Sequence, residues 1–229
     1  MGTRYLDANE VKQDHIDKLG DKLGPLFHEL LNEVTWLYMK WEEYVELFGK
    51  KPSRIDLLNQ SAPLFFRMIQ DSLWENILLH IARITDPPKS TGKENLTIQI
   101  LISHVKEDIK EKVSKQIDIA MKKSEFCRDW RNRHIAHCDL NLALGKKAEP
   151  LKQASRAMVK DALESIASVV NTISEYYCDS SLSFGLSASP GGAVDLLYII
   201  NDGIKADNDR KERIKSRNYL PEDLIHPDL

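Results

Sequence analysis

The apolar residues of the chain recur at helical spacing from its first quarter onward. Between residues 26 and 48 they fall three or four positions apart, which places them on one face of a helix. Pro25 suits the first position of that helix, and Gly49 follows its last apolar residue as a stop signal. We therefore expect a long amphipathic helix that begins at Pro25 and ends before Gly49.

A second apolar stripe predicts another long helix over residues 64–84. Ser61 is a candidate N-cap for it, and Pro63 can occupy its first turn. The helix should end before Asp86-Pro87-Pro88, because a proline disfavours helical backbone in the residue that precedes it.

The rest of the chain continues the helical pattern and shows no alternation of apolar and polar residues that would indicate a strand. The expected fold is all-α, an up-and-down bundle of four long helices with a C-terminal helical appendage. We expect a lead-in at 1–24, the bundle at 25–178, and a linker with a C-terminal helix and tail at 179–229. Further helices are expected at 96–106, 107–136, 151–178 and 193–216, with loops at 87–95, 138–150 and 179–192.

The composition is that of one globular domain, and it excludes several classes of protein. The 229 residues are 42% hydrophobic with a formal net charge of −3, which supplies a core and argues against a chain coated in nucleic acid. No apolar run approaches the roughly 20 residues of a membrane span, and the acidic beginning of the chain does not resemble a signal peptide. Three cysteines without a C-x-x-C pair fit a reducing compartment, so we expect a cytoplasmic protein.

The common nucleotide-binding and protease signatures are absent. Gly92-Lys93 lacks the earlier glycine of a phosphate-binding loop, and Glu94 stands where a magnesium-binding Ser or Thr is needed. No cofactor is therefore expected.

One segment, residues 128–139, carries chemistry that the rest of the chain lacks. Three arginines and two histidines lie in its first ten positions. Arginine binds phosphate through its planar fork, and histidine exchanges protons near neutral pH. Together they can cut RNA without a metal: a base takes the proton of the 2′-hydroxyl, an acid protonates the leaving oxygen, and a cation stabilises the phosphate.

The spacing of these residues matches a known signature. Arg131-Asn132 followed by His137 resembles the R-x(4–6)-H motif of the HEPN superfamily, in its abortive-infection-type version with Asn after the arginine. Residues 74–96 resemble the second helix and the following loop of that branch. The resemblance covers residues 25–178.

The resemblance implies a helical bundle that dimerises, with the motif helices of two protomers forming one composite cleft. Many HEPN members are metal-independent endoribonucleases of toxin–antitoxin, abortive-infection or other defence systems, and others are non-catalytic modules. By this resemblance Arg131 would hold the scissile phosphate, His137 would be the general acid or base, and Asn132 would position one of them. The residues left to support the site or bind RNA would be Arg128, Arg133 and His134.

Helical geometry leaves the identity of the reacting pair open. At about 100° per residue, Arg131 and His137 lie about 240° apart and share no face of a straight helix. Either the helix ends or distorts near Ile135, or each protomer contributes one of the two residues. Arg133 lies four residues before His137, and His134 lies three residues from both motif residues, so these two remain alternatives.

The same residues also have structural interpretations. Arginine and histidine are common near helix C-termini, and Arg131 could pair with Asp129, Asp139 or a carboxylate on another helix. The two motif histidines and Cys138 could be metal ligands, but a closed zinc site needs a fourth ligand, so no metal is expected.

Polar and aromatic residues outside the motif are expected to be structural. His80, on an apolar helix, should be a core or edge histidine. Asp71 and Glu75 should form a solvated face, although they could instead meet the motif arginine. Core or dimer contact is favoured over base stacking for the aromatic stripe of Trp36, Tyr38, Trp41 and Tyr44.

The last helix has an apolar first half and a charged second half. Residues 205–217 carry six basic and three acidic side chains, which indicates either a solvated helix with i,i+4 ion pairs or a basic arm that adds RNA affinity. The apolar half could pack against a second protomer.

Three functional hypotheses result. The first is a HEPN homodimer that cleaves RNA without a metal in a defence or toxin–antitoxin system. The second is a non-catalytic HEPN dimer that binds a nucleotide, RNA or a partner protein. In the third, the chain is itself an antitoxin or a scaffold paired with a nucleotidyltransferase-like protein. An antitoxin or a nucleotidyltransferase-like protein is a further candidate partner.

Overall fold

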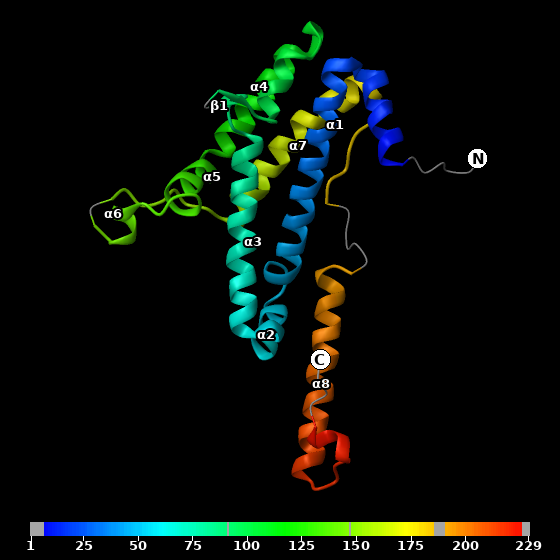
Figure 1. Cartoon of the computed structure of the whole chain (residues 1–229), viewed down its shortest axis with the longest axis vertical. Coiled ribbons are helices and arrows are strands. Elements are labelled where there is room, and N and C mark those ends of the chain that lie inside the picture. The colour runs from blue at the N-terminus through cyan, green and yellow to red at the C-terminus, as the bar shows by residue number, and fades with distance from the viewer. Residues whose placement is uncertain (1–6, 91, 147, 186–190, 226–229) are drawn as a thin grey trace, which may run out of the picture. The chain divides into compact units, whose positions relative to one another are not determined.

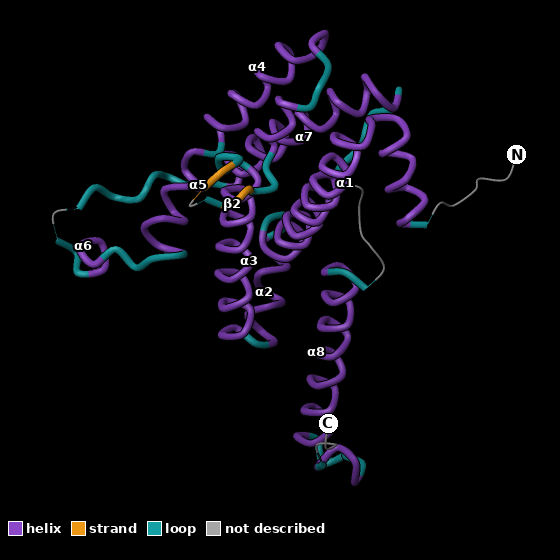
Figure 2. The backbone as a smooth tube through the Cα atoms, turned by 45° about the horizontal axis from the view of Figure 1, so that its top comes forward, coloured by secondary structure: helices purple, strands orange, loops and turns teal. Residues whose placement is uncertain are grey.

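The computed structural model is a helical bundle, and the all-α prediction is confirmed (Figures 1 and 2). The structure describes residues 7–90, 92–146, 148–185 and 191–225. The α-helices are α1 (Ala8–Phe48), α2 (Pro52–Ser61), α3 (Pro63–Ile84), α4 (Glu107–Lys123), α5 (Glu125–Trp130), α6 (Leu140–Ala143), α7 (Arg156–Cys178) and α8 (Ala193–Lys215). The remaining elements are a π-helical turn, η2 (Arg131–Ile135), two 3-10 helices, η1 (Ile98–Ser103) and η3 (Pro221–Leu224), and two short strands, β1 (Lys89–Ser90) and β2 (Lys93–Glu94), paired antiparallel.

The first helix begins earlier than the sequence pattern predicts. Asp7 accepts hydrogen bonds from the backbone N–H groups of Asn9 and Glu10, both at 2.8 Å, and the Glu10 carboxylate accepts one from the Asp7 N–H at 3.0 Å. These reciprocal bonds form a capping box, which satisfies backbone donors at the start of the helix. The expected start at Pro25 is therefore wrong, since Pro25 lies inside α1.

Two glycines let α1 fold back on itself. Gly20 has φ 86° and ψ 167°, a conformation that divides α1 into two helical segments. A Cβ on Gly24 would lie 2.6 Å from the Ile16 Cα, so only glycine lets the two segments approach this closely. His15 and His28 meet across this contact with their Nδ1 atoms 3.1 Å apart, and burial lowers the pKa of His15.

Three further predicted boundaries are corrected. The predicted helix over 107–136 is interrupted at Ser124, which is fully buried with φ −96° and ψ 0°. Ser61 does not cap α3: it ends α2, a helix absent from the prediction, and its hydroxyl donates to the Leu58 carbonyl. The long helix expected from residue 151 begins at Arg156, because Ser155 is its N-cap.

Other boundaries agree with the pattern. Pro63 opens α3, and α3 ends at Ile84, just before Asp86-Pro87-Pro88. The short helix expected at 96–106 is present as the 3-10 helix η1. The last helix, α8, ends within one residue of its predicted limit.

The described chain divides into two compact units. The first takes in residues 7–41 and 74–185, and the second takes in residues 42–73 and 191–225. The core of the first unit brings together apolar side chains of α1, α3, η1, α4, α5 and α7, among them Phe27, Leu30, Leu37, Ile77, Leu78, Ile81, Leu101, Ile117, Phe126, Leu163 and Ile173. The second unit has a smaller hydrophobic core, formed by Leu47, Leu58, Phe66, Ala193 and Leu197.

The charged half of α8 forms ion pairs within the second unit. Lys211 contacts Asp207 at 2.6 Å, and Lys215 contacts Glu212 at 2.7 Å. Arg213 pairs with Asp223 rather than with a residue one turn away on α8. The solvated interpretation of this helix therefore accounts for these charges. In the described ranges, no helix combines the length and the apolar character needed to cross a membrane.

Candidate functional site

The motif lies where a helix changes geometry and ends. After α5, the backbone widens into η2, where the Ala136 N–H donates to the Arg131 carbonyl at 2.9 Å, five residues back. The Asp139 N–H then donates to the Arg133 carbonyl at 3.1 Å, and no helical residue follows Ile135 before α6. The expected end or distortion near Ile135 is confirmed. The separation of about 240° on a straight helix therefore does not apply to Arg131 and His137. π-turns of this kind often occur at functional sites.

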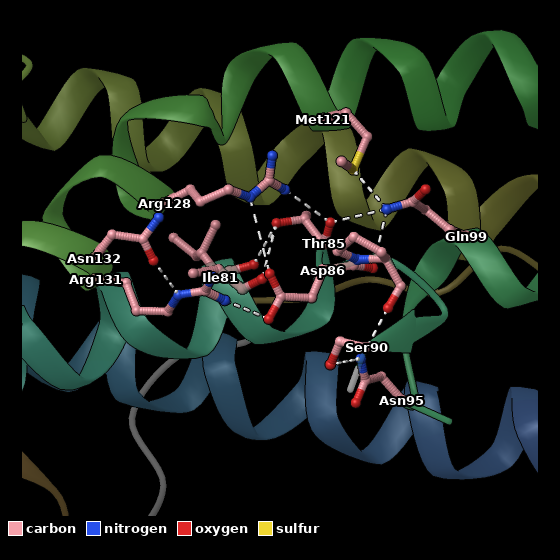
Figure 3. A network of polar contacts seen from close by, with 12 residues as sticks. Ile81, Thr85, Asp86, Ser90, Asn95, Gln99, Met121, Arg128, Arg131 and Asn132 are labelled. Atoms are coloured by element: carbon pink, nitrogen blue, oxygen red, sulfur yellow. Dashed lines mark hydrogen bonds and ion pairs between the residues drawn. The ribbon is translucent and has the colours of Figure 1, made fainter. Parts of the chain in front are cut away.

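Arg131 is held by an acidic partner from another part of the chain. Its Nη1 donates to the Asp86 carboxylate, and its Nε donates to the Asn132 side-chain oxygen at 3.0 Å (Figure 3). The Arg131 and Asp86 side chains are only 24% and 20% exposed. The motif arginine is therefore fixed at the end of α3, with Asn132 in direct contact with it.

Asp86 lies between two arginines. Arg128 donates to the Thr85 carbonyl at 3.0 Å, and its Nε lies 3.8 Å from the other oxygen of Asp86. Gln99 holds the same turn from the opposite side by donating to the carbonyls of Thr85 and Asp86, at 3.1 and 2.9 Å (Figure 3). This network fixes α5 to the residues that follow α3.

The sequence analysis uses Asp86 to end a helix and as part of the family resemblance, and does not pair it with Arg131. The expected structural partners of Arg131 are Asp129, Asp139 or a carboxylate on another helix, whereas the structure pairs Arg131 with Asp86, in the turn that follows α3. No spacing rule connects residues 86 and 131, so sequence reasoning had no signal for this pair.

Arg133 contacts both ends of the connection that follows the motif, at Asp139 and at Glu149. Its Nη2 donates to the Glu149 carbonyl, and its Nε lies 3.7 Å from the Asp139 carboxylate at the other end of that connection. Asp129 accepts from the Lys152 N–H at 2.8 Å. The structure therefore gives Arg133 contacts that hold the connection against α5.

The two histidines of the motif have different surroundings. His134 lies 3.5 Å from the Glu75 carboxylate and edge-on to Trp130, with ring centroids 5.5 Å apart. His137 is exposed, and its side chain has no hydrogen bond or ion pair within the described ranges. Of the two motif histidines, His137 is therefore the one whose ring has no partner among the described residues. In the same ranges, no three His, Cys, Asp or Glu side chains gather as metal ligands.

Residues around the motif are mostly as predicted. Asp71 pairs with Arg67 at 2.9 Å on a solvated face, whereas Glu75 meets His134 rather than the motif arginine. His80 is 3% exposed and lies 2.8 Å from the Glu33 carboxylate, as expected of a core histidine.

The aromatic stripe is only partly buried. Trp41 and Tyr44 belong to the core, but Trp36 is 53% exposed. Of the expected core or dimer contact, the core part is therefore wrong for Trp36, and the dimer contact stays a prediction.

The motif lies within a range of the chain that a family model matches. The family model HEPN_AbiU2, described as AbiU2, matches residues 20–189, a range that contains the motif and Asp86. No curated protein and no solved structure matches the chain. Because the family model covers well over half of the 229 residues, the chain belongs to AbiU2, a HEPN-type abortive-infection family.

Proposed function

We propose that this protein is a cytoplasmic, metal-independent endoribonuclease of a defence or toxin–antitoxin system, and that it acts as a homodimer with a composite Arg/His cleft. The observation that carries the proposal is that one motif holds both an anchored arginine and an exposed histidine whose side chain has no partner among the described residues. Arg131 is held by Asp86 and Asn132, while His137 lies beyond the π-turn, exposed and without a partner in the described residues.

The anchored arginine retains capacity for a phosphate. A guanidinium carries five N–H donors, and the contacts to Asp86 and Asn132 use those of Nη1 and Nε. Its Nη2 has no partner in the described ranges, and the side chain is 24% exposed. Arg131 can therefore keep its orientation while it donates to a phosphate oxygen.

The proposed reaction is attack within the RNA strand. A base removes the proton of the 2′-hydroxyl, the 2′-oxygen forms a bond to phosphorus, and the bond from phosphorus to the 5′-oxygen breaks. An acid protonates that leaving oxygen, and Arg131 stabilises the extra charge on the phosphate. The products are a 2′,3′-cyclic phosphate and a 5′-hydroxyl end.

The reaction needs a base and an acid, which explains the role of a second copy. His137 supplies one proton-exchanging group per chain, and a dimer in which two motif helices meet supplies two. His134 is the alternative second group, with Glu75 to orient its ring.

The test is cleavage of an unstructured RNA oligonucleotide in excess EDTA by wild type, His137→Ala and Arg131→Ala. Wild type should give cyclic phosphate ends and should not cut the all-deoxy analogue. Each variant should lose about 100-fold or more in rate with its circular dichroism spectrum unchanged, since general acid–base catalysis by His137 and charge stabilisation by Arg131 each contribute about that factor. His104→Ala, which changes a half-buried histidine outside the motif, is the matched control and should cut normally. Cleavage by His137→Ala at the wild-type rate would refute the assignment.

A second function is favoured by the structural contacts of the arginines. Arg128, Arg131 and Arg133 each contact a backbone carbonyl or a carboxylate of the chain itself. A non-catalytic HEPN dimer that binds a nucleotide, RNA or a partner protein would use the motif in this way. It predicts salt-dependent binding of RNA or a partner, with no cleavage by wild type under any condition.

A further inference from the structure

Trp36 differs from the other aromatic residues of α1. Trp41 is 6% exposed, and the Tyr38 ring stacks on Phe184 with centroids 4.9 Å apart. Trp36, a member of the same aromatic stripe, is 53% exposed. A large flat ring on the surface is a suitable platform for a nucleic acid base, because every base has a face that stacks on an aromatic ring.

A lysine is fixed beside this ring. The Lys40 ammonium lies 5.8 Å from the Trp36 ring centroid and donates to the Asn76 side-chain oxygen at 2.9 Å. It also lies 3.4 Å from His80 Nδ1. An ammonium has three N–H donors, so one is left for a ligand. Burial, and then the nearby Arg83, lower the pKa of Lys40.

A buried histidine sets the arrangement. His80 is 3% exposed, and burial is the main cause that lowers its pKa to about 4, so its ring is neutral at neutral pH. Its Nε2 donates to Glu33 at 2.8 Å, which leaves Nδ1 as the acceptor for Lys40. Glu33 also accepts from Arg83 Nη2 at 2.9 Å, while the Arg83 side chain is 60% exposed. Lys40 and Arg83 thus belong to one cluster with a single carboxylate, Glu33, which gives the cluster an excess of one positive charge beside an exposed indole.

This cluster lies next to the motif, across α3. All of its residues belong to the first unit, and α3 runs between α1 and α5 (Figure 1). Asn76 contacts α1, whereas the preceding residue, Glu75, contacts His134. Lys40 and His134 therefore lie on different sides of α3, about one helix diameter apart, on the order of 10 Å. A few nucleotides can span this separation.

We propose that Trp36, Lys40 and Arg83 form a nucleotide-binding platform for single-stranded RNA, with a base stacked on Trp36 and the adjoining phosphate held by Lys40 and Arg83. This inference rests on the proposed function, because it places a further part of the same substrate beside the motif. Stacking and a single net charge carry little sequence preference. The platform would therefore add affinity and register and would leave the choice of base open.

The test measures binding separately from cleavage. The full chain with His137→Ala is titrated against a fluorescein-labelled, unstructured RNA oligonucleotide, and binding is followed by anisotropy and by quenching of tryptophan fluorescence. Adding Trp36→Ala should weaken binding about tenfold, since one stacked base contributes a factor of that order. Trp36→Phe should restore most of the affinity. Lys40→Met should weaken binding and reduce the slope of log affinity against log salt by about one.

The matched control is Phe65→Ala. Phe65 is 52% exposed on α3, in the second unit, and its one ring contact in the described residues is with Phe66. This variant should bind RNA as the parent does. Equal affinity of the Trp36→Ala and parent chains, or no RNA binding by either, would overturn the platform.

Two other results would assign the ring elsewhere. If light scattering shows that Trp36→Ala converts a dimer to a monomer and a concentration that restores the dimer restores affinity, Trp36 is a contact between copies. If adenosine monophosphate alone displaces the RNA at micromolar concentration, the site takes a free nucleotide. Either result overturns the proposal.

The platform and the nuclease can fail independently. Trp36-dependent binding without cleavage by wild type would leave the platform standing and remove the proposed reaction. Cleavage that depends on His137, combined with RNA binding indifferent to Trp36, would do the reverse.

Discussion

Removing the Asp86 carboxylate should destabilise the protein measurably, because it is the common partner of two motif arginines. Asp86→Ala deletes the ion pair with Arg131 and leaves Arg128 Nε without the carboxylate oxygen that lies 3.8 Å away. The three side chains are 20%, 24% and 29% exposed, for Asp86, Arg131 and Arg128 respectively. Water can therefore replace the lost carboxylate only in part.

The expected loss can be worked from these contacts. A hydrogen bond between charged groups contributes about 1.5–3 kcal/mol, and the partial exposure of this pair places it near the lower end. The longer contact with Arg128 adds less than about 1 kcal/mol. We expect a loss of about 2–3 kcal/mol, which lowers the Tm of a chain of this size by roughly 5–10 °C.

The assay is thermal unfolding followed by circular dichroism at neutral pH. Asp118→Ala is the matched control: Asp118 is exposed on α4 with no partner in the described residues, so its Tm should be within about 1–2 °C of wild type. A double-mutant cycle of Asp86→Ala with Arg131→Met should give a coupling energy of about 1–2 kcal/mol. A coupling below about 0.3 kcal/mol, or an unchanged Tm for Asp86→Ala, would show that the pair does not anchor the motif arginine.

Three further predictions concern the rest of the chain. Gly24→Ala should lower the Tm, because the new Cβ would meet backbone atoms of the first α1 segment. Gly203→Ala, with open space around it, should raise the Tm slightly. A Gly24→Ala variant as stable as wild type would contradict the close approach. By NMR, His80 should titrate near pH 4 rather than near 6.5. Because the unfolded chain then binds the extra proton, the free energy of unfolding should fall by on the order of 3 kcal/mol as the pH drops from 6.5 to 4. A normal titration of His80, or a His80→Gln variant with the same pH dependence of stability, would refute this. A thiol reagent should modify the exposed Cys138 in the native protein and reach Cys127 only after unfolding, because Cys127 is fully buried and burial raises its thiol pKa far above the usual value; rapid native labelling of Cys127 would be the contrary result.

Local rules predicted the elements whose boundaries depend on neighbouring residues. The end of α3 follows from the prolines after Asp86, and its start follows from Pro63. The capping box of Asp7 and Glu10 was available in the sequence as well, since its spacing is three residues, but the segment has no apolar run and was assigned to a lead-in.

The interruption at Ser124 has no such local signal. The residues on both sides of Ser124 are good helix formers, and the bend places Phe126 and Cys127 in the core. The free energy gained by burying those side chains decides where the helix breaks, and that gain depends on helices that are distant in the sequence.

Local sequence patterns were enough to predict the all-α fold, most helix limits, and an arginine, an asparagine and a histidine at the spacing of the HEPN motif. These features depend on residues within one or two helical turns of each other, where periodicity and capping act. Packing between distant segments established that Asp86 anchors Arg131, that Arg133 contacts the connection after the motif while His137 has no partner among the described residues, and that Trp36 is exposed beside Lys40. Each of these depends on contacts between residues far apart in the chain, which packing of the bundle brings together and which no spacing rule encodes.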